Sequence, residues 1–580
     1  MLSFKGKFLG NGKTITVNLE STDLRVMAPF RFVDQALIQN LTIAGTIKYT
    51  EQDQEGACGG IVGVNYGYTT LNKCIFTGSL LKGDNTPPDD AATSYYGGFV
   101  GWNTRSITIR DCLFNPTEIT VSDEHAATFY NNDYSTLPRA YYLTPFGKTQ
   151  GCRVYAREED VPADVTVFPE TFFNGTTYYV ESGLKVDNTI AADQPGHYYI
   201  NMPTEGIEYY TIPAGIRHFK VYDDGGKDGK ASEYCDADLV LTVPSGCLIQ
   251  ATGTVTTCDY RGKVALYDGD SYWDDEFDSW DSYPYYGEPE WVDPVVTTGE
   301  SMDIYFRADY DADTDASNLD LVVSVIEMPL QDKANNDALI AANSGKLVNA
   351  ALTGRKLYVD NDWNTICLPF SLSKEQIDAS LLMGCVIKEL DTDASNYEHP
   401  TGYHNGTLYL NFKDAETIEA GKPYLIKWSK HKVYNYGIPD PGFVDVTVTA
   451  TTPAAITSSD GYVSFVGTYS PTDIFSADKT NLYVGSNNKL HYPWANNMQH
   501  FYLNACRGYF RLNKGLTAGD PSAVKEFRLN FGEDEPLSII NFQLSIGEAD
   551  GWYDLNGRKL GGKPTKRGLY IHNGEKIAIK

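Results

Sequence analysis

A seven-residue motif occurs twice near the start of the chain and limits what this region can fold into. GGIVGVN at residues 59–65 recurs as GGFVGWN at residues 97–103. Each copy precedes a short strand-like segment, and a weaker copy of that segment lies at residues 38–47. A repeated unit that cannot bury its apolar face alone buries it by stacking on its own copies. The repeat therefore predicts a parallel β-solenoid.

Superposing the three segments predicts which side chains stack. One ladder consists of Leu41, Cys74 and Cys112, and a second, two residues on, consists of Ile43, Phe76 and Phe114. Side chains two residues apart lie on the same face of a strand, so both ladders should face inward. The paired glycines should lie at the corners. Cys74 and Cys112 could form a disulfide, but stacked in-register positions favour buried thiols.

The repeat resembles the GLUG motif of bacterial surface proteins and adhesins. GGIVG and GGFVG match the core of that motif, and FKGKFLGNGKTI is similar to the strand and turn that usually precede it. The resemblance covers about residues 1–120 and implies a right-handed parallel β-helix-like solenoid, to which we assign residues 1–135. A strand begins at once without a leader, so we expect an N-terminal truncation that removed a signal peptide.

Composition favours an all-β chain and narrows the classes of partner. Forty-one Tyr, 52 Gly and 27 Pro beside 7 Met are typical of short strands joined by tight turns. The net charge is −29, and no basic run could neutralise a phosphate backbone, so we expect no nucleic-acid partner. No apolar stretch approaches the roughly 20 residues of a membrane helix, so we expect no membrane-spanning segment.

The middle of the chain predicts an antiparallel β-sandwich. Residues 234–269 contain a cysteine, an alternating strand, a Pro-x-Gly turn, a second cysteine and a strand that ends in Tyr-Asp-Gly. This pattern resembles the CUB domain over residues 195–328, and residues 136–194 form a connecting β segment. The resemblance implies a disulfide between Cys235 and Cys258, with Cys247 left over.

A calcium site is one possible consequence of the CUB resemblance. The carboxylates that could match the calcium ligands of such domains are Asp268 and Asp309, and Asp311 continues an alternating acidic run. Gly262 stands where a further carboxylate is expected, and the run lacks the glycine and the bidentate glutamate of a calcium loop. We therefore expect no cofactor and a solvated acidic loop, with calcium at these three residues as the alternative.

Residues 271–291 concentrate aromatic and acidic side chains. The candidate ligand-binding rings are Tyr272, Trp273, Trp280, Tyr283, Tyr285, Tyr286 and Trp291. Such rings either cover the sandwich as a lid or contact a ligand. Large rigid rings lose little entropy on binding, whereas the visible solenoid faces are mostly small or polar, so we expect this segment to contribute most to binding. Its acidic neighbours favour a neutral glycan or a basic protein surface.

The second half of the chain predicts further sandwich structure. Residues 329–346 are a polar linker, and residues 347–535 contain alternating strands of one or two sandwich domains. Ser373 and Gln376 form a capping-box pattern, which predicts a short helix from about Lys374. WNTICLPFSL, IEAGKPYLIKW and RGYFRLN resemble segments of large secreted proteins of gut-type Gram-negative bacteria. This resemblance indicates a family rather than a function.

Residues 536–580 form a separate basic tail in an acidic chain. An Asn-Gly-Arg turn, a Gly-Leu-Tyr-Ile strand and the final lysine resemble the C-terminal sorting domain of type IX secretion. The resemblance implies an extracellular or outer-surface location. The alternative is a small terminal β-meander.

The sequence lacks the familiar catalytic motifs. It has no GxSxG nucleophile elbow, no HExxH zinc-binding motif, no GxxxxGK[ST] phosphate-binding loop and no CxxC pair. We therefore predict a non-catalytic bacterial cell-surface or secreted adhesin that binds a host or dietary glycan or a surface protein. The alternative is the accessory binding portion of an extracellular glycan- or protein-degrading enzyme whose catalytic module is absent from this chain.

Overall fold

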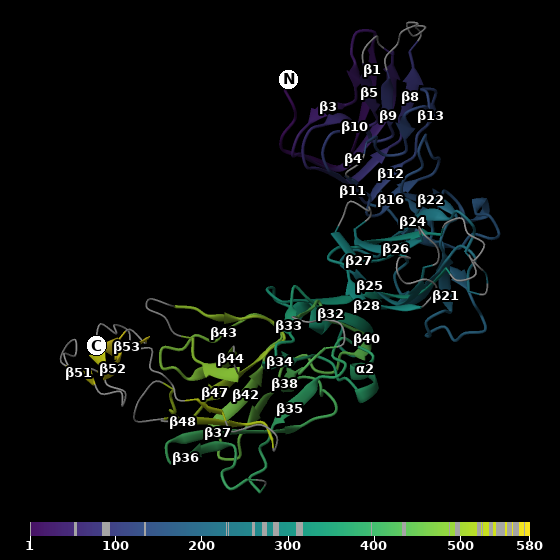
Figure 1. Ribbon diagram of the computed structural model, residues 1–580. Helices are drawn as coiled ribbons and strands as arrows, with labels where there is room; N and C mark the ends of the chain where they lie inside the picture. Colours follow the sequence, from purple (N-terminus) through teal and green to yellow (C-terminus); the bar gives the residue numbers. More distant parts are fainter. Residues whose placement is uncertain are drawn as a thin grey trace. The chain divides into compact units, whose positions relative to one another are not determined.

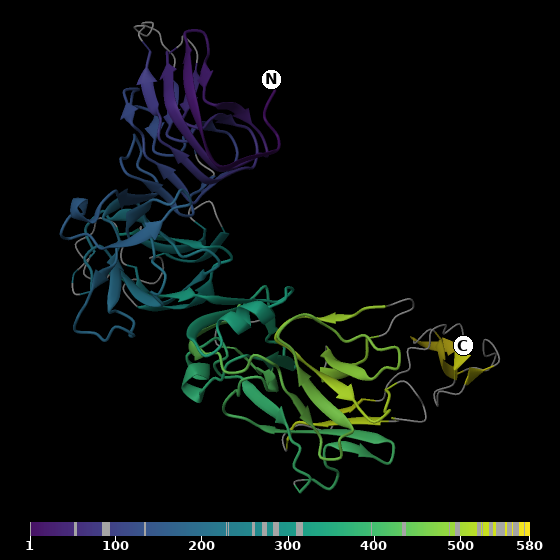
Figure 2. The same ribbon diagram turned by 180° about the vertical axis from the view of Figure 1, so that it is seen from behind.

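The computed structural model is nearly all β (Figures 1 and 2). It describes the chain except residues 1, 52–54, 84–92, 133–134, 228, 230, 258–261, 270–274, 282–288, 309–316, 396, 432–436, 486–487, 494–498, 519–523, 525, 533–537, 541–551, 554–558, 561–567, 573–574 and 580. The described helices are η1 (Glu158–Asp160), α1 (Asp337–Ala342) and α2 (Lys374–Asp378). None of these is long and apolar enough to cross a membrane.

The chain divides into two compact units. Unit 1 comprises Met1–Pro329, Val348–Thr353 and Asp440–Asp445, and unit 2 comprises Leu330–Leu347, Gly354–Pro439 and Val446–Lys580.

Unit 1 begins with strands that pair in parallel, layer upon layer. They are β1 (Lys7–Ser21), β2 (Val26–Met27), β3 (Phe30–Val33), β4 (Leu37–Tyr49), β5 (Gly56–Gly59), β6 (Val62–Asn65), β7 (Thr69–Phe76), β8 (Ser79–Lys82), β9 (Ser94–Gly97), β10 (Val100–Asn103), β11 (Ile107–Arg110), β12 (Cys112–Phe114), β13 (Glu118–Ile119), β14 (Ala126–Ala127), β15 (Ser135–Thr136) and β16 (Ala140–Tyr142). They belong to three sheets, which contain the series β1-β4-β7-β12-β16, β3-β6-β10 and β2-β5-β9-β14. Parallel pairing is what the stacked repeat predicted.

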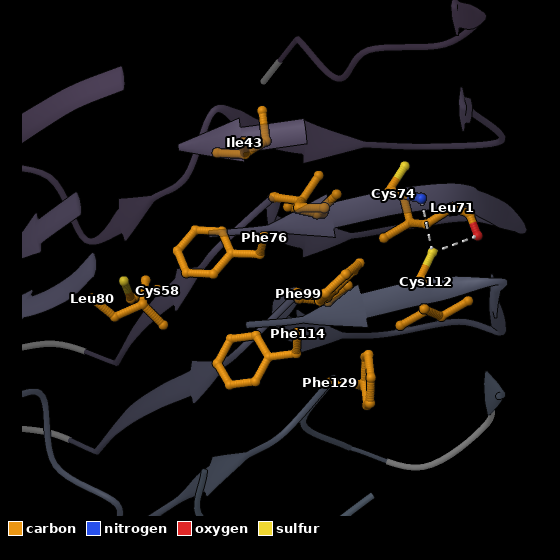
Figure 3. Packing of buried hydrophobic residues seen from close by; sticks show 14 of the residues in the cluster. Ile43, Cys58, Leu71, Cys74, Phe76, Leu80, Phe99, Cys112, Phe114 and Phe129 are labelled. Carbon is orange, nitrogen blue, oxygen red and sulfur yellow. Dashed lines mark hydrogen bonds between the residues drawn. The ribbon is translucent and has the colours of Figure 1, made fainter. Parts of the chain in front are cut away.

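The predicted residue ladders are confirmed. Leu41 pairs with Cys74, Ile43 pairs with Phe76, and Phe76 pairs with Phe114. All six ladder residues are fully buried, and Cys74 and Cys112 carry free thiols. The amide of Cys74 donates a hydrogen bond to the Cys112 sulfur at 3.3 Å, and the two phenyl rings stack 5.8 Å apart (Figure 3). Each ladder therefore continues the core from one layer into the next.

The glycine pairs lie at corners, as expected. Glycine is required there because neighbouring atoms lie so close to its Cα that a Cβ would not fit. The corner after Gly59 separates β5 from β6, and neither glycine of this pair has a positive φ. A Cβ at Gly60 would lie 2.8 Å from the ring of Phe76, and a Cβ at Gly98 would lie 2.7 Å from the ring of Phe114. The glycines thus leave room for the stacked phenyl rings.

A column of left-handed residues precedes the cysteine ladder. Asn40, Lys73, Asp111 and Arg139 have φ of 53°, 52°, 51° and 54°. The first three each stand one residue before a ladder position, and Arg139 stands one residue before Ala140, the strand partner of Cys112. Asparagine and aspartate visit this region more readily than lysine and arginine, because a Cβ is crowded there and their short polar side chains can hydrogen-bond locally. The stack of layers therefore holds the same bend in every layer, although the residue types at that bend differ.

The rest of unit 1 holds two sheets around one core. The strands are β17 (Cys152–Tyr155), β18 (Val167–Thr171), β19 (Thr177–Glu181), β20 (Lys185–Val186), β21 (Tyr198–Asn201), β22 (Glu205–Thr211), β23 (His218–Tyr222), β24 (Asp236–Thr242), β25 (Leu248–Thr256), β26 (Lys263–Asp268), β27 (Asp275–Asp281), β28 (Glu290–Val296), β29 (Ser301–Arg307), β30 (Asn318–Ile326), β32 (Leu347–Thr353) and β40 (Gly442–Thr447). The two sheets run β20-β21-β23-β30-β25-β28 and β22-β24-β29-β26-β27, whereas β17, β18 and β19 continue the first sheet of the parallel layers, and β32 and β40 belong to a separate three-stranded sheet. Their arrangement is compatible with the expected sandwich.

Two strand pairs in these sheets differ from the antiparallel expectation. β21 pairs with β23 in parallel, and β22 pairs with β24 in parallel. Consecutive strands alternate between the two sheets here, so each strand meets the next but one along the chain. Such a crossover restores the same strand direction, whereas a tight hairpin reverses it.

A buried ionic cluster joins the parallel layers to the two-sheet part of unit 1. Arg139 is 5% exposed, and it donates to Asp111 at 2.6 Å and to Glu300 at 2.6 Å. Arg110 donates to the same Glu300 oxygen at 2.6 Å, and the Gly246 amide donates to the other oxygen at 3.0 Å. Burial alone would raise the pKa of Glu300, but the charges of Arg139 and Arg110 hold that pKa below its ordinary value.

Unit 2 contains two larger sheets around its own core. The strands are β31 (Met328–Gln331, which begins in unit 1), β33 (Lys356–Tyr358), β34 (Asn364–Cys367), β35 (Val386–Leu390), β36 (Gly402–His404), β37 (Thr407–Asp414), β38 (Pro423–Lys427), β39 (Gly437–Pro439), β41 (Ala455–Thr457), β42 (Val463–Gly467), β43 (Thr472–Asp473), β44 (Asn481–Gly485), β45 (Lys489–His491), β46 (Tyr502–Leu503), β47 (Gly508–Leu512), β48 (Glu526–Asn530) and β49 (Ser538–Ile540). The larger sheets run β34-β38-β35-β37-β48-β49 and β41-β42-β47-β44-β45.

The helix predicted near Lys374 is confirmed as α2. The Ser373 hydroxyl accepts a hydrogen bond from the Gln376 amide at 3.2 Å, and the Gln376 side chain accepts one from the Ser373 amide at 3.0 Å.

The tail forms a four-stranded antiparallel sheet of β50 (Trp552–Tyr553), β51 (Lys559–Leu560), β52 (Gly568–His572) and β53 (Glu575–Ile579).

The phenyl ladder generates a prediction about stability. Phe114→Ala should lower the free energy of unfolding by about 3–5 kcal/mol, because it leaves a cavity beside Phe76 and above Gly98. Chemical denaturation followed by circular dichroism measures the change. Tyr68→Ala, at a side chain that is 71% exposed, is the matched control and should change stability little. Equal stability of the two variants would contradict the ladder.

The ionic cluster generates a prediction about pH. Glu300→Gln should destabilise the protein by about 3 kcal/mol at pH 7, because it leaves Arg139 buried without one of its counter-charges. The folded pKa of Glu300 is depressed, so its stabilisation is present above pH 4.5 and is lost as the pH falls below that value. The gap between wild type and variant should therefore narrow at pH 3.5. Glu124→Gln, at a side chain that is 83% exposed, should show no such gap.

Candidate functional site

The predicted aromatic segment is only partly covered by the described residues. Trp291 lies in β28 and is 55% exposed. Trp280 lies in β27, where its backbone pairs with Val264. Tyr272, Trp273, Tyr283, Tyr285 and Tyr286 lie outside the described residues, as does the Trp280 side chain. A leading role of this segment in binding stays a prediction.

The predicted calcium ligands are likewise only partly described. Asp268 ends β26, and its carboxylate accepts a hydrogen bond from the Thr298 amide at 2.8 Å. Asp309 and Asp311 lie outside the described residues. The described part of the chain brings no three His, Cys, Asp or Glu side chains together around a common point. Calcium binding also stays a prediction.

Cys235 is buried at the start of β24. Its thiol donates to the Pro203 carbonyl at 3.5 Å, and burial raises its pKa to about 12. Within the described residues Cys235 has no disulfide partner, and Cys258 lies outside them. The implied pairing is therefore untested.

A ring-lined groove lies on the outer surface of the parallel layers of unit 1. It has a volume of about 390 Å³. Two pairs of rings line it. Phe32 stacks on Tyr66 at 6.1 Å between centroids, and Tyr95 contacts Trp102 at 4.2 Å between centroids. We call this surface the layer groove.

The layer groove is hollow because its middle layer carries small side chains. Val64 is the strand partner of both Phe32 and Trp102, and Ala57 is the strand partner of Tyr95. In-register stacking thus places a small residue of one layer between large rings of its neighbours. The floor is then open to a ligand, while the rings form its walls.

The backbone beneath the floor requires glycine. A Cβ at Gly56 would lie 1.8 Å from the Tyr49 hydroxyl, which donates to the Arg25 carbonyl at 3.1 Å. Burial raises the pKa of Tyr49 to about 12, so the hydroxyl remains neutral at physiological pH. The Tyr49 hydroxyl beneath the floor therefore adds no charge to the site.

The charged groups at the rim of the layer groove balance. Asp23 and Glu55 contribute two carboxylates, and Arg25 and Arg31 contribute two guanidinium groups. The Arg31 guanidinium lies 5.3 Å from the centre of the Phe32 ring. All four rim residues are exposed. The guanidinium groups can donate hydrogen bonds to a ligand and the carboxylates can accept them, while the four charges sum to zero. Rings and balanced polar groups suit binding of a neutral ligand.

The sequence predictions overlooked this groove. They described the visible faces of the repeat region as small or polar, whereas Tyr66 is 43% exposed and Trp102 is half-buried. One signal was available in the repeat itself, since Val64 of the first motif is replaced by Trp102 in the second. Such a change at one register position creates a step between layers.

Comparisons with known proteins give little further information. No family model matches the chain, and no curated protein matches it. A solved structure, the CUB1-EGF-CUB2 domains of rat MASP-1, is similar to 41% of this chain and 99% of its own length, at 9% identity and a TM-score of 0.17. A likeness at this level does not establish a common fold.

Cys235, which comes immediately before β24, generates a prediction. Peptide mapping of the non-reduced protein should find Cys235 linked to Cys258, with the linked peptide lost after reduction. A disulfide requires Cα atoms within about 7 Å, so this linkage would place Cys258 next to the start of β24. Linkage of either cysteine to Cys247 would contradict the CUB-like assignment.

Proposed function

We propose that this chain is a non-catalytic, secreted or cell-surface bacterial protein of the adhesin type that binds a neutral glycan. The observation that carries the proposal is the layer groove, with Trp102 and Tyr95 on one side and Phe32 and Tyr66 on the other. The negative face of an aromatic ring attracts the weakly positive C–H groups of a sugar. The hydroxyl groups of the same sugar can pair with the rim carboxylates and guanidinium groups.

The parallel layers suit presentation of such a groove. We propose that they form a GLUG-type solenoid, whose stacked registers hold the four rings at set positions. Rings held in place by strands lose little further freedom on binding, which favours affinity. We also propose a CUB-like sandwich after the solenoid and a type IX sorting role for the tail. Their support is the sequence resemblance, together with the β-sheets found in both regions.

The proposal predicts the effect of removing one ring. On an array of neutral glycans, the full chain should bind at least one class without releasing product. Trp102→Ala should weaken that binding at least fivefold, the factor that corresponds to about 1 kcal/mol for an aromatic hot spot. Tyr502→Ala removes a ring that is 60% exposed and lies outside both the layer groove and residues 271–291, and it is the matched control. Its binding should equal that of wild type.

Other outcomes would overturn parts of the proposal. Loss of binding in Trp291→Ala but not in Trp102→Ala would move the site to the aromatic segment of residues 271–291. Release of product from any glycan would support the accessory-enzyme alternative. Failure to bind any neutral glycan would reject the proposed ligand class.

A further inference from the structure

A second hollow adjoins the layer groove at the first of the parallel layers of unit 1. It has a volume of about 550 Å³. Its lining consists of Leu2, Phe4, Pro29, Phe30, Arg31 and Phe32. Arg31 and Phe32 also line the layer groove, so the two spaces meet at these two residues. We call the second space the Phe4 hollow.

Backbone bonds and ring contacts hold the phenyl rings of the Phe4 hollow in place. The Phe4 amide donates to the Phe32 carbonyl at 2.8 Å, and the Asp34 amide donates to the Phe4 carbonyl at 3.0 Å. The centroid of the Phe30 ring lies 5.7 Å from that of Phe4 and 5.2 Å from that of Phe8. Phe4 and Phe30 are half-buried, so part of each side chain stays open to solvent. Exposed apolar surface of this kind marks a place where a ligand can bind.

Arg31 is a positioned hydrogen-bond donor at the boundary of the two spaces. Its Nε donates to the Val26 carbonyl at 3.1 Å, and its guanidinium lies 5.3 Å from the centre of the Phe32 ring. These contacts do not engage its two terminal nitrogens. The side chain is exposed, so a ligand can reach those nitrogens from solvent. A planar guanidinium can donate two parallel hydrogen bonds to neighbouring oxygen atoms.

The charges around the Phe4 hollow favour a neutral ligand. Of the described residues that line it, Arg31 alone carries a charge. Asp23 and Glu55 in the adjoining layer groove would repel an anion that extended into it. A neutral sugar suits both spaces, because its C–H faces can pack on the rings and its hydroxyl groups can accept hydrogen bonds from Arg31.

We infer that the binding site continues from the layer groove into the Phe4 hollow and takes a linear, neutral oligosaccharide that crosses Arg31 and Phe32. One end of the oligosaccharide lies in the layer groove, and the other end packs against Phe4 and Phe30. Arg31 donates hydrogen bonds to hydroxyl groups at the crossing. The inference rests on the proposed function, because the layer groove supplies the first contacts.

An extended site makes affinity depend on the length of the oligosaccharide. Once the first sugars are held in the layer groove, the next sugars meet the Phe4 hollow at a high effective concentration. Their contacts add to the affinity without a second loss of translational freedom. Long members of one oligosaccharide series should therefore bind more tightly than short members.

Calorimetric titration of the full chain tests the inference. The probes are cello-, malto-, manno- and xylo-oligosaccharides, each as the disaccharide and the hexasaccharide. In at least one series the hexasaccharide should bind about fivefold or more tightly than the disaccharide, which is the contribution of one aromatic hot spot.

Phe4→Ala removes one ring of the Phe4 hollow and keeps the backbone bonds to β3. It should weaken hexasaccharide binding about fivefold or more and leave disaccharide binding unchanged, so that the gain with length disappears. Trp102→Ala should weaken the binding of both, because Trp102 lines the layer groove. Tyr68→Ala is the matched control, because its ring is 71% exposed and lines neither space. This control should bind both probes as wild type does.

A second variant protects the test against misfolding of Phe4→Ala. Arg31→Ala alters an exposed side chain and should weaken hexasaccharide binding about fivefold or more, since it removes hydrogen bonds from a charged donor. Arg31→Lys should restore only part of that binding, because an ammonium group lacks the planar pair of donors.

The possible outcomes separate this inference from the proposed function. The inference is wrong if hexasaccharides bind no more tightly than disaccharides, or if folded Phe4→Ala keeps the gain with length. If Phe4→Ala does not fold, unchanged hexasaccharide binding by Arg31→Ala overturns it. Disaccharide binding that depends on Trp102, without a gain with length, would keep the proposed function and reject only the extension. Failure of all four series to bind would also reject the extension, while the glycan array tests the layer groove separately.

Discussion

In-register parallel stacking of the N-terminal layers is the constraint on which the first part of this protein depends. Phe76 lies between Ile43 and Phe114 in one ladder, so each layer buries its apolar face only against the next. Gly60 and Gly98 allow this approach because any side chain there would meet a phenyl ring. A shift of one residue would turn every inward side chain outward, which makes the register hard to alter.

The same register creates the proposed binding surface. Because Val64 stands between Phe32 and Trp102, the outer face carries a step that a uniform repeat would lack. The core and the layer groove thus have one origin, with inward positions kept similar and outward positions free to vary. This division explains how a repeat fold can carry a specific site without losing stability.

Charge plays different parts in the two units. In unit 1 the buried Arg139 is neutralised by Asp111 and Glu300, so the cluster is structural and joins two parts of the unit. In unit 2 the buried Arg355 donates hydrogen bonds to the carbonyls of Cys506 and Thr365, and the charges of Arg507 and Asp332 act on it as well. Carboxylates thus compensate the buried guanidinium in unit 1, whereas backbone carbonyls accept most of its hydrogen bonds in unit 2.

The sequence by itself determined the local features of this protein. Period-two alternation and the repeated motif predicted the Leu41 ladder, and the spacing of Ser373 and Gln376 predicted α2, because these patterns depend only on neighbouring residues and on the copies of one unit. Only the tertiary structure decided the parallel pairs β21–β23 and β22–β24, the ion pair of Arg139 with Glu300, and the layer groove. The ion pair joins positions 161 residues apart, and the layer groove is lined by segments near residues 25, 57 and 102. No local pattern encodes such contacts, since they depend on how distant strands pack around a common core.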